Sequence, residues 1–289
     1  MIQRFETPDL ARAWCAEERG LGRSLGFIPT RGALHEGHLG LVRRAREEND
    51  RVCVSVFVNP LQFNDPGDFE RYRRDFEGDA DLLGENGCDM AFTGTLEQFF
   101  PDSQGSLERV PRVDPGPCAA GLEGTHRPGH FDGEATIVQR LFEVVHPDRA
   151  YFGQKDFQQA LVVGEIARRL GYPEVVVCPT SREEAGLARS SRNEQLTDEQ
   201  RVHALAIHDA LCAARDLWSA GERRPAELTA AMGRVLEAGP LCVEYAAVRD
   251  PEHWSGTGPT EPLERAVALI AGTLGKVRLI DNLRLDGAT

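Results

Sequence analysis

The sequence has few of the features that mark secreted, membrane-spanning or metal-binding proteins. Its seven cysteines are scattered and odd in number, and none forms a CxxC pair, so neither a disulfide framework nor a zinc site is indicated. No apolar run approaches the ~20 residues of a membrane span. The first residues, MIQRFETPDLARAW, lack the apolar core of a signal peptide. We therefore expect a reduced, cytoplasmic protein.

An excess of positive charge is also absent. The 33 lysine and arginine residues are outnumbered by 46 aspartate and glutamate residues, which gives a net charge of −13 at pH 7. A surface for nucleic acid or anionic membrane needs a basic footprint. Arginines cluster at 43–46 and 71–74, but acidic residues surround both groups, and solvated helix faces account for them. We therefore expect neither a nucleic-acid nor a membrane partner.

The order of apolar runs predicts a parallel α/β domain followed by a smaller unit. A chain of 289 residues exceeds what one compact core usually holds. In the first sixty residues a strand (24–29), a glycine turn, a helix (38–49) and an apolar strand (51–58) follow one another, and such a right-handed crossover implies a parallel sheet. From residue 180 the pattern changes to two helices and three strand-like runs, typical of a small antiparallel unit. We expect domains at 1–179 and 180–289, a long loop over 101–129, and further helices at 75–86, 135–145 and 160–170.

The stretch PTRGALHEGH at 29–38 is the most informative part of the chain. A strand that leads through a glycine turn into a helix start is the geometry that receives phosphate, because amide groups and the helix dipole favour an anion there. His35 and His38 add two side chains that can donate hydrogen bonds. On this pattern alone, phosphate binding and metal binding remain alternatives. Zinc is disfavoured because no third ligand lies at a usual spacing.

Polar residues follow other predicted strands as well. Asn59 and Gln62 come after the strand at 51–58, and Lys155 comes after a strand at 149–152. Ligands of open α/β sheets bind beyond the carboxyl ends of strands, which makes these residues candidate contacts. Ordinary loop hydrogen bonding explains the two amides equally simply, as does a generic strand-end lysine for Lys155. The acidic helix at 75–86 is either a place for a divalent cation bridged to phosphates or an exposed acidic face.

Six ordered blocks give the whole chain a resemblance to the pantothenate synthetase family. The blocks are PTRGALHEGH at 29–38, VFVNPLQF at 56–63, LEGTHRPGHFDG at 122–133, PDRAYFGQKDFQQ at 147–159, GLARSSRNEQLT at 186–197 and RLIDN at 278–282. The resemblance implies a Rossmann-like nucleotidyltransferase domain of the HIGH-motif superfamily with a small α+β lid. It also implies an acyl-adenylate formed from pantoate and ATP with Mg²⁺, attack by β-alanine, release of AMP, and a homodimer.

The same resemblance implies roles for individual residues. Contacts to the reacting phosphates fall on His35, His38, Lys155, Ser190, Ser191 and Arg192. Further nucleotide contacts fall on Pro29, Thr30, Gly32, Gly37, Gly153 and Asp156. The acid is held by Gln62 and Gln159, with Asn59, Tyr72, Arg127 and His130 lining the site, and Asp79 lies on the metal side. This fits the chemistry, because attack of a carboxylate on phosphorus depends on positioning and on neutralising charge.

The chain departs from the family pattern at four of these places. Arg31 and Arg189 replace methionines, Gln154 replaces a glutamate, and Gly78 replaces one of two adjacent acidic residues, for which Glu77 is a candidate substitute. Arginine offers a charged fork for carboxylate or phosphate, whereas methionine offers an apolar wall. Two hypotheses follow. Either pantoate is the acid and the arginines face solvent or ATP, or Arg31 and Arg189 bind an extra anionic group on the acid or amine. A nucleotidyltransferase and a non-catalytic ligand-binding relative are the competing classes.

Overall fold

The computed structural model describes residues 2–63 and 66–287, and the chain divides into two compact units. Unit 1 comprises Met1–Ala119, Arg127–Gly153 and Gln158–Cys178. Unit 2 comprises Ala120–His126, Gln154–Phe157 and Pro179–Thr289. The main division thus falls at residues 178 and 179, and two short segments from the first half of the chain belong to unit 2.

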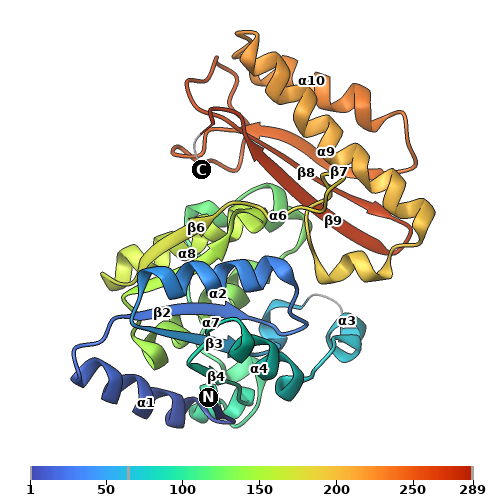
Figure 1. Cartoon of the computed structure of the whole chain (residues 1–289). Coiled ribbons are helices and arrows are strands. Elements are labelled where there is room, and N and C mark those ends of the chain that lie inside the picture. The colour runs from blue at the N-terminus through green and yellow to red at the C-terminus, as the bar shows by residue number, and fades with distance from the viewer. Residues whose placement is uncertain (1, 64–65, 288–289) are drawn as a thin grey trace. The chain divides into compact units, whose positions relative to one another are not determined.

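Unit 1 is built on a six-stranded sheet in the order β1-β4-β3-β2-β5-β6, and each pair of neighbouring strands is parallel (Figure 1). The predicted parallel sheet is therefore confirmed. The first strand of the chain, β1, was not expected, since three residues are too short to show a period. The strands are β1 (Gln3–Phe5), β2 (Leu25–Thr30), β3 (Arg51–Val56), β4 (Met90–Phe92), β5 (Arg149–Gly153) and β6 (Glu174–Cys178).

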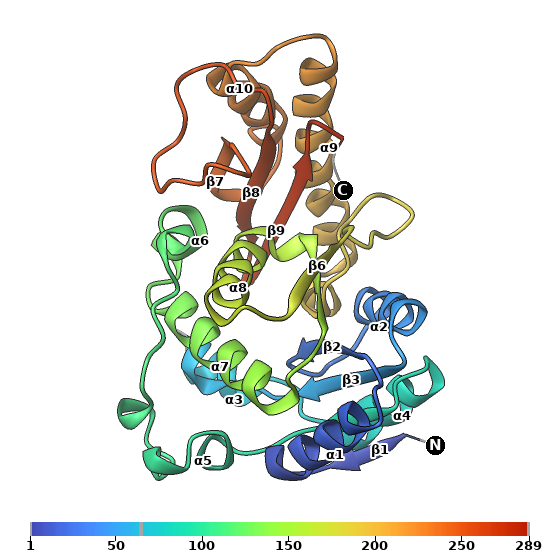
Figure 2. The same cartoon turned by 90° about the vertical axis from the view of Figure 1, so that its left-hand side faces the viewer.

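Helices cover both faces of this sheet, because its strands carry apolar side chains on both sides. Phe27 of β2 packs with α1, α7 and α8, whereas its neighbour Ile28 packs with α2 and α4. Figure 2 shows the same layers from another side. The helices are α1 (Pro8–Gly20), α2 (Glu36–Glu48), α3 (Pro66–Arg71), α4 (Phe76–Glu85), α5 (Leu96–Phe99), α7 (His130–Val145) and α8 (Phe157–Leu170).

The segment predicted as one long loop contains short helical turns. Three 3₁₀ turns and α5 interrupt residues 96–119, and Leu122–His126 forms the helix α6 within unit 2. Helix α7 also begins earlier than predicted, at His130 rather than at Ala135. Gly129 precedes it with φ at 77°, a conformation that glycine adopts without strain, and this sharp entry hides the helix start from a periodicity argument.

Unit 2 contains an antiparallel sheet of three strands, as expected, in the order β7-β8-β9. Two helices bury their apolar stripes together with this sheet, and the shared core includes Leu211, Trp218, Met232 and Ile270. The elements are α9 (Asp198–Ser219), α10 (Pro225–Leu236), β7 (Cys242–Arg249), β8 (Val267–Leu274) and β9 (Val277–Arg284).

A partly buried ionic cluster holds α6 against the sheet of unit 2. Arg278 of β9 donates to both oxygens of Glu123 at 2.9 and 2.5 Å and to Glu244 at 2.9 Å. Tyr245 donates its hydroxyl to Glu123 at 2.8 Å, and burial raises the pKa of that phenol well above its usual value. One arginine therefore balances two carboxylates, and α6 depends on it.

Replacing Arg278 tests this dependence. We expect Arg278→Met to lower the free energy of unfolding of unit 2 by about 3–5 kcal/mol, because it removes the guanidinium that pairs with the buried Glu123 carboxylate and with Glu244. Urea unfolding followed by tryptophan fluorescence measures the change. Arg215→Met is the matched control: Arg215 pairs with its exposed neighbour Asp216, and such pairs contribute at most about 1 kcal/mol. Equal losses in the two variants would show that the cluster is not what holds α6.

Candidate active site

The turn after β2 is held in shape from two sides. Thr30 donates its hydroxyl to the Ser55 carbonyl at 2.8 Å, and the Gly32 amide donates to the Thr30 hydroxyl at 3.2 Å. Gly32 and Ala33 both have positive φ, at 78° and 52°. A Cβ on Gly32 would lie 2.7 Å from Asp79 Oδ2, so glycine is needed here for space as well as for conformation.

Asp79 of α4 accepts hydrogen bonds from two backbone amides of this turn. Its two carboxylate oxygens accept from the Ala33 amide at 3.1 Å and the Leu34 amide at 3.2 Å. The side chain is buried, and burial raises the pKa of its carboxyl while the two amides oppose that shift. The metal-side role predicted for Asp79 stays a prediction. What the structure assigns to this carboxylate is the support of the turn.

The acidic residues beside Asp79 are also engaged elsewhere. Glu77 pairs with Arg4 of β1 at 2.5 Å, and the Gly78 amide donates to Asp75 at 3.0 Å as part of the helix cap. Among residues 2–63 and 66–287, no group of three or more His, Cys, Asp or Glu side chains is arranged to hold a metal ion. A dedicated protein cage for a cation is therefore not formed by these residues.

His35 and His38 lie together at the start of α2. The Gly37 amide donates to His35 Nδ1 at 3.1 Å, and the His35 amide donates to His38 Nδ1 at 3.3 Å. The two rings are 4.1 Å apart, centroid to centroid. Because each Nδ1 accepts a hydrogen bond, the proton of each neutral ring is on Nε2. Both histidines thus offer an Nε2–H donor at a helix N-terminus, where an anion is favoured.

The loop after β3 is fixed to the start of α7. Asn59 donates to the Gly133 carbonyl at 3.1 Å and to Gln62 Oε1 at 3.1 Å, and His130 Nδ1 lies 2.9 Å from the Gln62 carbonyl. A Cβ on Gly133 would stand 2.1 Å from the Leu61 carbonyl oxygen, so α7 meets the loop there without any side chain between them. The structure therefore brings Asn59, Gln62 and His130 together.

The sequence reasoning missed one polar residue of this region, Glu134. It follows Gly133 on α7 and is 4% exposed. Its carboxylate accepts a short hydrogen bond from the Gln159 amide of α8. Glu134 directly precedes the helix predicted over 135–145, and the available signal was an acidic residue spaced three and four positions before Ile137 and Val138 of its apolar face.

In unit 2, β9 holds the segment that carries Lys155. The side-chain NH₂ group of Asn282 donates to the backbone carbonyls of Gln154 and Lys155, both at 2.9 Å. The side-chain oxygen of Asn282 accepts from the Gln154 side chain at 3.3 Å. The Lys155 ammonium lies 3.6 Å from the Asp156 carboxylate. Gly153, the last residue of β5, precedes this turn. The Gln154 departure thus has a structural role, since its side chain pairs with Asn282.

The neighbouring residue of β9 holds the 180–193 segment. Arg182 donates to both oxygens of the buried Asp281 at 2.6 and 3.1 Å, and Arg189 Nε donates to the Arg182 carbonyl at 3.2 Å. Ser190 caps the turn Ser191–Gln195 by accepting from the Arg192 amide at 3.3 Å. Lys155 and the serine-rich segment are therefore both anchored to consecutive residues of one strand.

Arg31 lies in unit 1, with its guanidinium 5.5 Å from the ring centroid of Tyr72. Both predicted anion-binding arginines thus have contacts inside their own units. Arg31 contacts Tyr72, and Arg189 contacts the hairpin of residues 181–189, in which Arg182 and Ala188 form an antiparallel bridge. Arg127 lies three residues before His130 and is half-buried. A cavity of about 290 Å³ adjoins Arg31, and its other lining residues include Val56, Phe57, Phe69, Arg73, Phe76 and Asp79.

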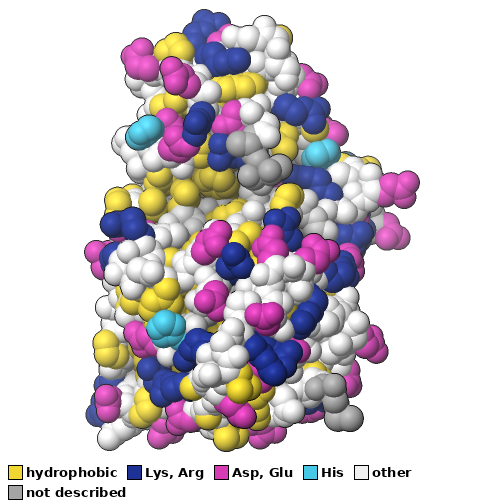
Figure 3. Space-filling model, turned by 60° about the vertical axis from the view of Figure 1, so that its left-hand side comes forward, with side chains coloured by type: hydrophobic (Ala, Val, Ile, Leu, Met, Phe, Trp, Pro, Cys, Tyr) yellow, Lys and Arg dark blue, Asp and Glu magenta, His cyan; other side chains and the backbone are white. Residues whose placement is uncertain are grey.

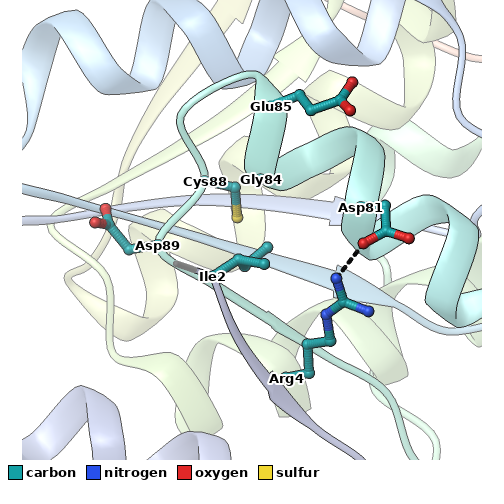
Figure 4. Close-up of a pocket in the computed structure, with 7 residues that line it drawn as sticks. All are labelled: Ile2, Arg4, Asp81, Gly84, Glu85, Cys88 and Asp89. Atoms are coloured by element: carbon teal, nitrogen blue, oxygen red, sulfur yellow. Dashed lines mark hydrogen bonds and ion pairs between the residues drawn. The ribbon is translucent and has the colours of Figure 1, made fainter.

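A second pocket, of about 470 Å³, lies between β1 and α4 and contains none of the predicted site residues (Figure 4). The ion pair of Arg4 with Asp81 crosses it, so the hollow belongs to the edge of the sheet. Acidic and basic side chains are interspersed over the face shown in Figure 3. In the described part of the chain, no helix is both long and apolar enough to cross a membrane.

The model of the family described as pantoate-beta-alanine ligase matches residues 3–284. The chain is 43% identical to a pantothenate synthetase of Moorella thermoacetica over 99% of both chains, and 47% identical to one of Rubrobacter xylanophilus over 97% and 96%. It superposes on the crystal structure of pantothenate synthetase from Thermus thermophilus with a TM-score of 0.89 and 44% identity, covering 98% and 99% of the chains. A ligase of Francisella tularensis, complexed with beta-gamma ATP and beta-alanine, has a TM-score of 0.77 and 29% identity over 100% and 99%.

The anchoring of Lys155 can be tested directly, because the chain has only two lysines, Lys155 and Lys276. The Lys155 side chain is 18% exposed, whereas Lys276 is exposed and serves as an internal standard. We expect Asn282→Ala to free the segment and to raise the rate of Lys155 acylation relative to Lys276 several-fold, measured by peptide mass spectrometry. Asn86→Ala, which removes an asparagine from the end of α4, should leave the ratio unchanged. An unchanged ratio in Asn282→Ala would contradict the anchoring.

Proposed function

Because the chain belongs to the pantoate-beta-alanine ligase family, we propose that it joins pantoate to β-alanine at the expense of ATP, by way of an acyl-adenylate. The observation that carries this proposal is the pair of Nε2–H donors of His35 and His38 at the N-terminus of α2, beyond the end of the central strand β2. Such donors suit the charge that develops on phosphate oxygens during attack by a carboxylate.

The reaction needs two displacements. First, a carboxylate oxygen of pantoate bonds to the α-phosphorus of ATP while the bond to the bridging oxygen breaks and pyrophosphate leaves. The amine of β-alanine then bonds to the acyl carbon, loses a proton, and releases AMP. In this scheme His35 and His38 stabilise the phosphate charge, and Gln62 and Gln159 hold the acid. No covalent bond to the protein forms at either step.

Unit 2 contributes the remaining phosphate contacts in this proposal. Lys155, Ser190, Ser191 and Arg192 supply one ammonium, two hydroxyls and one guanidinium, and Asp156 contacts the nucleotide. The turn residues Pro29, Thr30, Gly32 and Gly37, with Gly153, let the backbone approach ATP. We propose that residues 1–179 bind ATP and the acid, and that residues 180–289 act as the lid.

Magnesium enters this scheme as the ion that accompanies ATP. The oxygens of Asp79 each accept an amide hydrogen bond, so at most their remaining lone pairs are available to a cation. Mg²⁺ is commonly bound by one or two carboxylates together with substrate phosphates and water. The residues present fit that arrangement, in which the phosphates supply much of the charge. The proposal also includes a cytoplasmic homodimer, which sedimentation velocity would detect.

A second candidate function differs only in the substrate. Arg31 adjoins a cavity of about 290 Å³ that is also lined by Arg73 and Arg74, together with Asp75 and Asp79. The three arginines are the feature that would suit a substrate with an additional anionic group. Arg189 is the other arginine of that hypothesis, and it belongs to unit 2. Pantoate remains the acid that we propose, because the glutamines and the histidine pair need no second anion to act.

Substitution of His35 separates its two roles. In His35→Asn the side-chain oxygen still accepts at the helix start, since asparagine is a favoured N-cap, but the Nε2–H donor is lost. We expect the free energy of unfolding to change by less than about 0.5 kcal/mol while adenylation slows by about 10²–10³-fold. Pantoate-dependent exchange of pyrophosphate into ATP measures the rate. His35→Ala should in addition lower the free energy of unfolding by about 1 kcal/mol, because α2 loses its N-cap. Full activity of His35→Asn would contradict the proposed role.

Substitution of Arg31 decides between the two acids. If pantoate is the acid, Arg31→Met keeps pantoate-dependent exchange within about threefold of the wild type, because the apolar wall of the family pattern is restored. If a dicarboxylate is the acid, the same change lowers its use by ~10–100-fold, the equivalent of a charged hydrogen bond. A panel of mono- and dicarboxylic acids with both proteins gives the answer. Robust pyrophosphate exchange with a dicarboxylate and none with pantoate would overturn the proposal that pantoate is the acid.

A further inference from the structure

Glu134 is a buried acidic residue for which the mechanism so far has no use. It is 4% exposed and lies on α7 among Phe131, Ala135, Ile137 and Val138, all buried. Removing a carboxylate from water is costly unless a partner compensates for it. One partner is the Gln159 side chain, whose amide nitrogen donates to Glu134 in a short hydrogen bond. Gln159 is itself only partly buried, so its other side remains accessible.

This contact determines which end of the Gln159 amide faces outward. A primary amide has a donor end and an acceptor end, and a half-turn exchanges them. In the structure Gln159 directs its NH₂ group to Glu134 Oε1, which is the orientation that a carboxylate requires because it only accepts hydrogen bonds. Its carbonyl oxygen is then the group that it offers to a ligand. Without the negative charge beside it, either orientation of the amide would be available.

Gln62 is fixed in the opposite sense by Asn59. The Leu61 amide donates to the Asn59 oxygen at 3.2 Å, which directs the Asn59 NH₂ group to Gln62 Oε1 at 3.1 Å and to the Gly133 carbonyl at 3.1 Å. The oxygen of Gln62 is therefore turned toward Asn59, and its NH₂ group is what it offers on the other side. Both arrangements depend on consecutive residues of α7, Gly133 and Glu134.

We propose that Glu134 is a positioning residue that makes the two glutamines a matched pair for a hydroxy acid. Gln62 donates to an oxygen of the acid, and Gln159 accepts a hydrogen from a hydroxyl group. This inference rests on the proposed function and deepens it by naming the group that is read. A site built to pair with a substrate hydroxyl rejects the analogue that lacks it, because a buried polar group is then left unpaired.

The test compares pantoate with two analogues that each lack one of its hydroxyl groups. In the wild type we expect a strong preference for pantoate in kcat/KM of pyrophosphate exchange. In Glu134→Gln the neutral partner accepts either orientation of Gln159, and we expect the preference over one analogue to fall about tenfold. Glu143→Gln is the control, since it removes a charge from an exposed ion pair of the same helix without reaching the site.

A double-mutant cycle with Gln159→Leu separates positioning from general disturbance. Gln159→Leu should lose the same preference, and Glu134→Gln should have no further effect on selectivity in that background, because it acts through Gln159. The inference is overturned if Glu134→Gln keeps the full preference, or if it slows all three acids equally. If that variant does not fold, an undiminished preference in Gln159→Leu overturns it instead. Failure of the proposed function is a separate result, namely no pantoate-dependent exchange in the wild type. The same ratios are then measured with the hydroxy acid that drives exchange.

Discussion

The two hydrogen bonds from the Ala33 and Leu34 amides to Asp79 are the interaction on which the rest of the site depends. The chain leaves β2 in a left-handed turn, which exposes amides that a buried loop must satisfy. Asp79 satisfies both and so sets the direction in which α2 begins. His35 and His38 occupy the start of that helix, and their Nδ1 atoms are used in capping it. Their Nε2–H groups are thereby oriented before any ligand binds, which is what electrostatic stabilisation of a transition state requires.

In unit 2, two consecutive side chains of β9 orient the segments that carry the predicted site residues. Asp281 and Asn282 are consecutive on β9, and consecutive side chains leave a strand on opposite faces, so one strand can hold two segments. Asp281 holds the hairpin that leads to the serine-rich turn, and Asn282 holds the turn of Lys155. The RLIDN block of the sequence therefore marks the residues that support the segments of Lys155 and Ser190. Its first residue, Arg278, anchors α6 as well.

Periodicity and turn chemistry predicted the parts that depend on local sequence. The apolar runs and glycine positions predicted the parallel sheet, the antiparallel unit, and the glycine turn between β2 and the start of α2. The structure contains all three. Contacts between distant residues were not predictable in this way. Glu134 and Gln159 are 25 positions apart in the chain, and Glu123 and Arg278 are 155 positions apart. No local sequence pattern predicts a contact between such residues. Asp79 shows a different limit, since its residue type suits a metal ion and an amide pair equally well.

The two arginines that depart from the family pattern, Arg31 and Arg189, each make a contact within their own unit. Arg31 lies against the ring of Tyr72, and a cation–π contact between half-buried side chains contributes about 0.5–2 kcal/mol. Its aliphatic stem can also cover apolar surface much as a methionine does. Arg189 donates to the Arg182 carbonyl and so stabilises the hairpin before Ser190. These contacts explain both substitutions without a second anion on the substrate.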